Sequence, residues 1–543
     1  MSKFYLFKRL GDILQKPFRE HFLFLIAFFV LATSPYFIWQ FYVQKIYLNA
    51  TFVAIHCYLV SYLVTLFIGL IQIATIRKVV QGILIVLACI CFAVNFYCIF
   101  ELGYLLDADI VMLILGTDIN ETKEFASVLL PNWIILAVGG IFLIFLFLWY
   151  FSRQHQLNLK KKMSWLAMLG LAFCIAINIY TWKVWKEGPI YRLYEMTQYE
   201  VTDNLQSYYT HPKVTIVDRK QRPSNVVLII GESFARCHSS LYGYEKNTNP
   251  HLVALRDSSL LFAFNQVNSP APTTAESIRF ILSTYSKADD SPKHLKKWFE
   301  FTTIIELMQD CGYECVWFGN QARGSKKNGA ARVFAEACNR QWFLQREGSD
   351  NYNVNYDEIL VDSSAQYSHQ INPQEHHFII YHMMGSHFDY SMRYPKEYAK
   401  FSEKDYPTDP QSHRSTLASY DNSILYNDYV VWQIINLYRE KEAVVIYLPD
   451  HGQVMFRDAN SPEHFAHGKL GDDISYAYGV EIPFIIYTSP LFKLKHPEIM
   501  QRIKDSQAND KTWNGDDIPY LILDLIGVTD VNGESIAGKS IIN

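Results

Sequence analysis

Five apolar runs in the first third of the chain constrain its fold more than any other feature of the sequence. They cover roughly residues 21–43, 51–76, 79–100, 131–151 and 164–184. Each run is close to the ~20 residues that an α-helix needs to cross a hydrocarbon core about 30 Å thick. The chain has 543 residues, which is also too long for a single hydrophobic core. We therefore expect five transmembrane helices followed by a separate domain that faces water.

Basic residues orient these helices. Lys and Arg gather before the first run, between the second and third, and between the fourth and fifth: Lys3, Lys8, Arg9, Lys16, Arg19; Arg77, Lys78; Arg153, Lys160, Lys161, Lys162. Such loops are normally cytoplasmic, so residues after about 185 should lie outside the cytoplasm. The first run lacks an obvious cleavage site and is predicted to be a retained anchor. Joining the second and third runs into one segment would reverse this orientation, but it would scramble the basic pattern.

The organisation predicted from these features has three parts: a transmembrane domain at 1–185, an interfacial linker at 186–223 and an extracytoplasmic domain at 224–543. The linker is rich in Tyr, which favours the headgroup layer, although an ordinary tether fits equally well. The net charge of −4 does not suggest nucleic-acid binding. Four cysteines outside the apolar runs allow two disulfides in three pairings, and the sequence does not choose among them: Cys237, Cys311, Cys315 and Cys338.

The part after residue 224 alternates short β-rich runs with helical stretches, as expected of an α/β domain with a mostly parallel sheet. The expected strands are Asn225–Ile230, Glu314–Phe318, His377–Tyr381, Ala443–Leu448 and Ile482–Tyr487. Four of them run directly into polar residues. In open α/β sheets ligands bind outside the carboxyl ends of the strands, so Glu232, His382, His387, Asp450 and His451 should converge at one edge.

Carboxylate and imidazole side chains together suit Zn²⁺, and a catalytic zinc keeps one position open. A nucleophile is expected nearby, in the segment Pro272–Ile278. Thr273 and Glu276 match a helix capping box, which leaves Thr274 unexplained. Its hydroxyl would lie in the first helical turn, where free amides favour an anionic phosphate and a metal could activate the alcohol.

Two histidines follow the Asp-His pair, His464 and His467, and one or both could complete a second metal or phosphate site. A loop histidine taken singly is more often simply solvated. We expect His467 rather than His464 to take part.

The motifs together resemble the membrane-anchored bacterial phosphoethanolamine transferases of the alkaline phosphatase and sulfatase superfamily. The resemblance rests on Asn225–Ser233 with Leu241–Tyr244, on Thr274–Ser277, His382–His387, Tyr420–Ser423 and Pro449–Gly452, and on His467-Gly468. It extends over the chain, because that family also has five N-terminal spans before a periplasmic catalytic domain of alkaline phosphatase/sulfatase-like fold.

The resemblance implies roles for individual residues. Thr274 is similar to the nucleophile that carries the phosphoethanolamine group in a covalent intermediate. Glu232, Asp450 and His451 match zinc ligands, with Thr274 as the fourth. The remaining residues implied as contacts of substrate or a second metal are His382, His387, His467, Asn320, Lys326 and Glu121. Two cysteines that bracket the nucleophile's helix in the lipid A-modifying branch are replaced here by Pro270 and Phe280, so the choice between lipid A and the core stays open.

The predicted activity is a zinc-dependent transfer of phosphoethanolamine from phosphatidylethanolamine to lipid A or the lipopolysaccharide core. A monomer in the bacterial inner membrane, with its catalytic domain in the periplasm, would carry it out among membrane lipids. The alternatives are phosphoglycerol transfer, a sulfatase-like hydrolase and an inactive membrane scaffold or lipid sensor. Thr274 argues against a sulfatase, whose modified nucleophile would be Cys or Ser. The near-complete ligand set argues against a scaffold.

Overall fold

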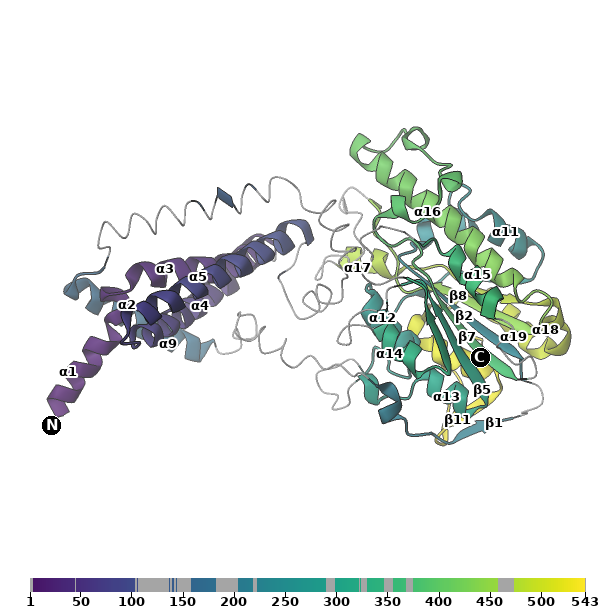
Figure 1. Ribbon diagram of the computed structural model, residues 1–543, viewed down its shortest axis with the longest axis horizontal. Helices are drawn as coiled ribbons and strands as arrows, with labels where there is room; N and C mark the ends of the chain where they lie inside the picture. Colours follow the sequence, from purple (N-terminus) through teal and green to yellow (C-terminus); the bar gives the residue numbers. More distant parts are fainter. Residues whose placement is uncertain are drawn as a thin grey trace. The chain divides into compact units, whose positions relative to one another are not determined.

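The computed structural model describes residues 3–43, 45–102, 158–181, 204–217, 222–289, 298–321, 330–345, 355–367, 375–457 and 473–542, with isolated residues 105, 136, 139, 140, 143 and 323. The chain divides into two compact units (Figure 1). The first ends at Tyr199, and the second runs mainly from Glu200 to Asn543. Each unit is described by itself.

The first unit is helical. Its helices are α1 (Lys3–Leu14), α2 (Lys16–Arg19), α3 (Phe22–Ile38), α4 (Tyr47–Gly69), α5 (Ala74–Tyr97) and α9 (Lys161–Tyr180). Short π-helical turns, Trp39–Val43 and Cys98–Leu102, extend α3 and α5. Four described helices are long and apolar enough to cross a membrane: Phe22–Phe41, Tyr47–Gly69, Ala74–Phe100 and Lys161–Tyr180. The expected span at 131–151 lies outside the continuously described residues.

The boundary between the second and third spans differs from the prediction. Helix α4 ends at Gly69 and α5 already begins at Ala74, so Arg77 and Lys78 lie in the first turns of α5 and not in the connecting loop. The guanidinium of Arg77 donates to the carbonyl of Ile71 at 2.8 Å. The side chain of Arg77 therefore bonds the connecting loop, although the backbone of Arg77 belongs to the helix.

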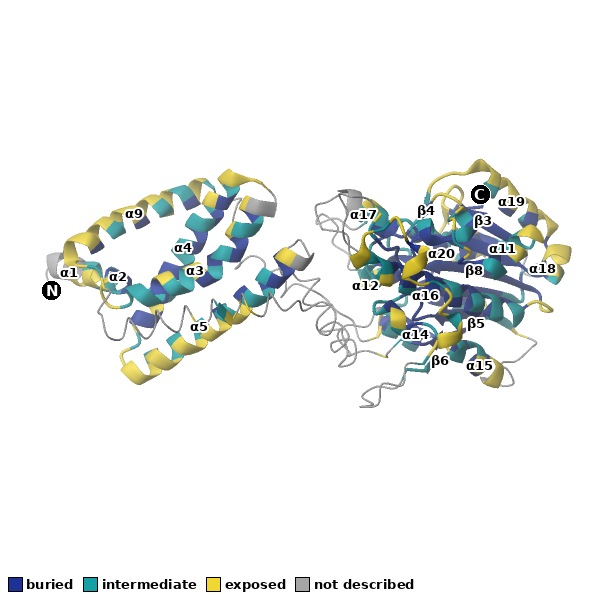
Figure 2. Ribbon diagram, turned by 90° about the horizontal axis from the view of Figure 1, so that it is seen from above, coloured by how far each residue is buried: buried dark blue, intermediate teal, exposed yellow. Residues whose placement is uncertain are grey.

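The outer faces of these helices suit a lipid solvent. Figure 2 shows exposed residues running along α5 and α9. In α5 they include the apolar side chains Val79, Ile83, Val86, Leu87 and Ile90. Some polar groups inside the unit are paired, as when Nδ1 of His56 meets the amide oxygen of Asn178 at 3.0 Å. Apolar side chains on the outside and hydrogen bonds between helices on the inside are typical of membrane helices.

The second unit is built on a seven-stranded sheet in the order β3-β9-β8-β2-β7-β5-β6. Its strands are β2 (Asn225–Gly231), β3 (Leu261–Phe264), β5 (Tyr313–Gly319), β6 (Arg340–Phe343), β7 (His376–His382), β8 (Ala443–Pro449) and β9 (Phe484–Thr488). The five strands β8, β2, β7, β5 and β6 are parallel, whereas β9 and β3 pair antiparallel. The predicted mostly parallel α/β sheet is confirmed, and all five expected strands are present with ends shifted by one or two residues.

Helices cover both faces of this sheet (Figure 1). Val226, Leu228 and Ile230 point into one buried cluster, and Val227 and Ile229 into the other, as alternation along a strand requires. The first cluster includes residues of α12 (Thr274–Ile281), α13 (Ile304–Asp310), α14 (Ala330–Ala337), α19 (Pro497–Asn509) and α20 (Ile518–Leu525). The second includes α11 (Pro250–Asp257), α15 (Glu358–Tyr367) and α16 (Gln411–Asn436). Helices α17 (Asp473–Val480) and α18 (Pro490–Lys495) flank β9 in the sequence.

Two small sheets complete the unit. Strand β10 (Trp513–Asn514) pairs with β4 (Val267–Asn268), and β11 (Val528–Val531) lies between β1 (Val214–Ile216) and β12 (Glu534–Ser535). Part of the predicted interfacial linker thus forms a strand of the second unit. All four cysteines of this unit are free in the structure, so neither optional disulfide forms.

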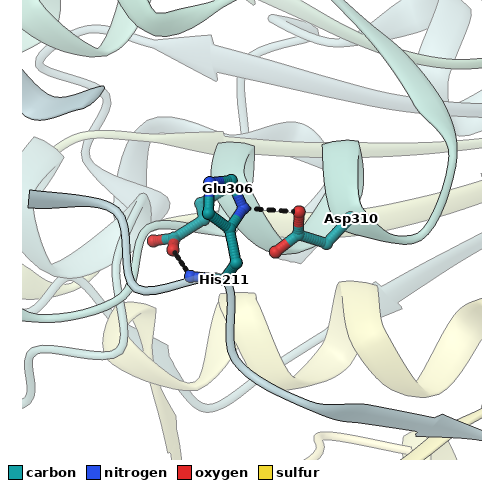
Figure 3. A group of neighbouring side chains, drawn as sticks. All are labelled: His211, Glu306 and Asp310. Carbon is teal, nitrogen blue, oxygen red and sulfur yellow. Dashed lines mark hydrogen bonds and ion pairs between the residues drawn. The ribbon is translucent and has the colours of Figure 1, made fainter. Parts of the chain in front are cut away.

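A carboxylate fixes the segment that leads into β1 (Figure 3). Glu306, in the first turn of α13, accepts the backbone N–H groups of Thr210 and His211 at 2.6 and 2.7 Å. It is almost fully buried, with 2% of its surface exposed. At the exposed end of the same helix, Nδ1 of His211 meets Asp310 at 2.9 Å. His211 adopts a positive φ of 47°, a backbone strain that these contacts hold in place.

Replacing Glu306 should therefore loosen this junction. Glu306→Ala would leave two backbone N–H groups without their acceptor, which costs about 1–3 kcal/mol when such groups are buried. Asp310→Ala is the matched control, because it removes an acid of the same helix that serves only an exposed ion pair. We expect a clearly lower midpoint of thermal unfolding in Glu306→Ala and little change in Asp310→Ala. Equal midpoints would contradict the role given to Glu306.

Candidate active site

Four parallel strands bring the chemically active residues to one edge of the sheet. In the sheet register Gly231 lies opposite Pro449, and Ile230 lies opposite His382. The residues that follow β2 and β8 are Glu232 and Asp450-His451. Because the strands are parallel, these side chains emerge next to one another at the carboxyl edge, where α/β sheets bind ligands.

Glu232, Asp450 and His451 form a compact buried cluster. One donor atom from each lies within 4.8 Å of the others, and none of the three residues is more than 1% exposed. Nε2 of His451 lies 3.2 Å from Oε1 of Glu232 and 3.6 Å from Oδ2 of Asp450. The other ring nitrogen, Nδ1, meets the carbonyl of Gly452 at 2.8 Å. That carbonyl can only accept, so Nδ1 carries a proton and Nε2 faces the carboxylates.

The cluster has two carboxyl groups for one imidazole, and each shifts the protonation of the others. Burial, reinforced by the charge of Glu232, raises the pKa of Asp450 to about 8. Burial opposes protonation of His451, but the carboxylates of Asp450 and Glu232 outweigh it and raise its pKa to about 9. Oδ2 of Asp450 is buried and accepts no hydrogen bond from the described residues. Two carboxylates, one imidazole and an unused buried oxygen fit a divalent cation such as zinc.

Thr274 lies beside this cluster. Its hydroxyl donates towards the carboxylate of Glu232, with Oγ1 at 3.2 Å from Oε2 and 3.4 Å from Oε1. It is the first residue of α12, whose first-turn amides have no partner within the helix. The arrangement places an alcohol, a carboxylate cluster and a helix N-terminus in contact, which are the components needed to hold and attack a phosphate group.

The predicted capping box does not form as expected. Thr273 is the N-cap residue, but its side chain makes no capping hydrogen bond to a backbone amide. Its hydroxyl instead meets Oε2 of Glu276 at 3.1 Å. The hydroxyl of Thr273 therefore bonds the side chain of Glu276 and no backbone amide of α12.

Strained backbone holds the carboxylates of Glu232 and Asp450 in place. Ser233 adopts a φ of 55°, which lets its amide donate to Oδ1 of Asp450 at 3.2 Å and its hydroxyl to Oε1 of Glu232 at 2.8 Å. Gly385 has a φ of 51°, and a Cβ there would lie 2.8 Å from the backbone nitrogen of Glu232. A strained non-glycine residue is characteristic of functional sites.

The other predicted contacts lie at the same edge or outside the described residues. His382 is buried; burial lowers its pKa to about 4, and its Nε2 has no hydrogen-bond partner among the described residues. His387 is half-buried, with Nδ1 2.8 Å from the carbonyl of Phe388. Predicted residues Glu121, Lys326 and His467, together with His464, fall outside the described part of the chain.

The side chain of Asn320 is held by hydrogen bonds within the protein. Its amide nitrogen donates to the carbonyl of Asn355 and to Asp357, both at 2.9 Å. Asp357 also accepts the amides of Met384 and Gly385 at 2.8 and 2.7 Å. Asn320 therefore helps fix the loop that follows β7, and only its buried Oδ1, which has no partner among the described residues, remains for a ligand.

Sequence reasoning missed Gln321. Its Nε2 donates to Oε2 of Glu232 and to the carbonyl of Met383, both at 3.0 Å. It thus ties the end of β5 to the cluster and orients the Glu232 carboxylate. The only sequence signal was its place directly after the strand end at Gly319-Asn320.

Fold and site define a class: an α/β domain of the sulfatase type with a candidate metal site, which follows a set of apolar helices in the sequence. The sulfatase family model matches residues 224–528, and a model described as phosphoethanolamine transferase EptA/EptB matches residues 61–186. The chain belongs to the phosphoethanolamine transferase family within that superfamily.

Individual relatives agree with this assignment. Phosphoethanolamine transferase EptC of Escherichia coli (strain K12) is 28% identical over 320 residues, which are 56% of this chain and 51% of EptC. Kdo(2)-lipid A phosphoethanolamine 7''-transferase of Salmonella typhimurium is 26% identical over 346 residues, or 62% of this chain and 57% of that protein. The chain thus spans about half the length of the first curated relatives it matches.

Solved structures confirm the fold. The zinc complex of the C-terminal periplasmic domain of E. coli EptC has a TM-score of 0.53 at 24% identity, covering 61% of this chain and 89% of that domain. The integral membrane lipooligosaccharide phosphoethanolamine transferase A of Neisseria meningitidis has a TM-score of 0.64 at 18% identity, covering 95% and 96%. The predicted combination of apolar helices and a sulfatase-like α/β domain is confirmed.

The contact of Gln321 with Glu232 can be tested by metal binding. Gln321→Ala should weaken zinc affinity by about 10–100-fold, the usual effect of losing a group that orients a ligand. Arg323→Ala is the control, since Arg323 lies two residues on and pairs with Glu336 at 2.6 Å. A competition titration with a chromogenic chelator would measure both variants. Unchanged affinity in Gln321→Ala would show that Gln321 does not position the carboxylate.

Proposed function

We propose that this protein is a zinc-dependent transferase that moves phosphoethanolamine from phosphatidylethanolamine to lipid A or the lipopolysaccharide core. The observation that carries the proposal is the contact of Thr274 with the buried carboxylate of Glu232 at the start of α12. Glu232, Asp450 and His451, with Thr274 itself, would hold the metal. When bound, zinc supplies Lewis-acid charge that favours the ionised alcohol and the developing charge on phosphate oxygens.

The first half-reaction loads the enzyme. Oγ1 of Thr274 attacks the phosphorus of phosphatidylethanolamine, a new Oγ1–P bond forms, and the bond to the diacylglycerol oxygen breaks. Glu232 is placed to take the hydroxyl proton, because that proton already points at its carboxylate. Diacylglycerol leaves after its oxygen gains a proton, and phosphoethanolamine stays on Thr274 as a covalent ester.

The second half-reaction unloads it. An acceptor hydroxyl or phosphate oxygen attacks the same phosphorus, the Oγ1–P bond breaks, and Thr274 regains its proton. We propose that the first-turn amides of α12, His382 and His387 contact the phosphate group or hold a second metal ion. His382 would act as a neutral imidazole, since burial lowers its pKa to about 4. Asn320 through Oδ1, and Lys326, His467 and Glu121, remain proposed contacts of the substrate.

A membrane anchor fits this chemistry. Both the donor and the released diacylglycerol are lipids, and four described helices are apolar and long enough to span a bilayer. We propose that the chain is a monomer of the bacterial inner membrane with residues 224–543 in the periplasm. The relatives named for lipid A and lipooligosaccharide support the choice of acceptor class.

Substitutions of the adjacent residues Thr273 and Thr274 distinguish the role of a helix N-cap from the role of a nucleophile. Thr274→Ala should abolish transfer in cells, because it removes the attacking oxygen. Thr273→Ala should leave activity largely intact and cost less than the about 1 kcal/mol typical of a capping hydroxyl, since the Thr273 side chain makes no capping hydrogen bond to an amide. Mass spectrometry of envelope lipids from cells carrying each variant would measure transfer. The proposal fails if the two variants are equally active.

A further inference from the structure

A second group of potential metal ligands lies at the opposite edge of the sheet. It consists of Glu314, Glu375 and His377, each of which offers a donor atom within 4.8 Å of the others. Glu314 and His377 lie opposite each other on the parallel strands β5 and β7, so their side chains share one face. Glu375 lies directly before β7, and its carboxylate reaches the same group. His377 is five residues before His382, or about 16 Å along a strand, which separates this group from the active site.

His377 is the observation that points to a ligand. Only 3% of its surface is exposed, and its Nε2 is buried without a hydrogen-bond partner among the described residues. That nitrogen lies 3.5 Å from Oε2 of Glu314, beyond the usual range for a hydrogen bond between nitrogen and oxygen. A buried imidazole nitrogen aimed at a carboxylate, yet too far to bond it, leaves room for a bridging group.

The spacing suits a metal ion. Ligand atoms around a tetrahedral zinc ion at 2.0–2.1 Å are roughly 3.4 Å apart, close to the 3.5 Å between Nε2 of His377 and Oε2 of Glu314. The guanidinium of Arg340 takes the other oxygen of Glu314, with Nε 2.5 Å from Oε1. Arg340 would therefore orient Glu314 from outside the site, as second partners of metal ligands do.

The cluster of His211, Glu306 and Asp310 provides a contrast (Figure 3). Its donor atoms are equally close, but Glu306 already accepts two backbone amides and Nδ1 of His211 already meets Asp310. No buried nitrogen of that cluster lacks a partner among the described residues. Proximity of acids and histidine therefore does not by itself indicate a metal site. The Nε2 of His377, which has no hydrogen-bond partner among the described residues, distinguishes the group at the start of β5 and β7.

We propose that Glu314, Glu375 and His377 form a second divalent-cation site, selective for zinc, that joins the beginnings of β5 and β7. One imidazole and two carboxylates favour zinc over calcium or magnesium. A fourth position is filled by water or by the second oxygen of a carboxylate. The site is structural: bound zinc stabilises the folded state in proportion to its occupancy, and it makes no contact with the reacting groups.

Zinc stoichiometry of the full-length protein in detergent tests this site. Wild type and variants are dialysed against one buffered concentration of free zinc, and metal per chain is measured by elemental mass spectrometry. Glu375→Gln and His377→Gln should each bind one zinc fewer than wild type and should lose part of the zinc-dependent rise in unfolding temperature. Glu375 is exposed, so Glu375→Gln decides the result if His377→Gln does not fold.

Glu440→Gln is the matched control. Glu440 is exposed and lies just before β8. Glu440→Gln therefore removes one negative charge near the same edge of the sheet, as Glu375→Gln does. It should bind as much zinc as wild type. Equal zinc content in wild type and Glu375→Gln would overturn the proposal, and so would an equal loss in Glu440→Gln, because surface charge alone would then explain the binding.

Discussion

The approach of two buried carboxylates, Glu232 and Asp450, is the constraint on which the rest of the catalytic unit depends. They follow neighbouring parallel strands, so the sheet itself forces them together. Two such charges without water repel each other, which is why burial and Glu232 together raise the pKa of Asp450. Under the proposed function, a cation held between them would turn this repulsion into attraction and let both acids stay charged and buried.

Much of the surrounding structure can be understood as support for this pair. Ser233 has a positive φ, and its amide and hydroxyl donate hydrogen bonds to the two carboxylates. Gly385 lets the loop after β7 approach Glu232 closely. Gln321 holds Glu232 from the end of β5, and His451 is oriented by the carbonyl of Gly452. Each support follows a different one of the four strands β2, β5, β7 and β8, so the site forms only when these four strands have come together.

The sequence predicted those parts of the molecule whose signal is local. The five expected strands consist of dense β-branched and aromatic residues, and they appear almost where predicted because both faces of this sheet are buried. Short or distant elements were missed. Strands β3 and β6 have four residues each, and β1 pairs with β11 through Val214 and Val531, a separation that no local pattern reveals.

In the candidate site, too, residues with a local sequence signal were predicted and residues that depend on tertiary contacts were missed. Glu232, Asp450 and His451 followed from polar residues at strand ends, whereas the role of Gln321 depends on a tertiary contact with Glu232. The capping box was wrong, because the Thr273 hydroxyl bonds the carboxylate of Glu276 and no backbone amide. A sequence pattern shows that both residues are present, but it does not show whether their side chains turn to the backbone or to each other.

The most direct test of the account is the state of Thr274 during turnover. The full-length protein would be mixed with phosphatidylethanolamine without an acceptor, then digested and analysed by tandem mass spectrometry. We predict that the peptide containing Thr274 gains the mass of one phosphoethanolamine group, located on that residue. An unmodified Thr274 with release of diacylglycerol, or a modification located on another residue, would contradict the central claim.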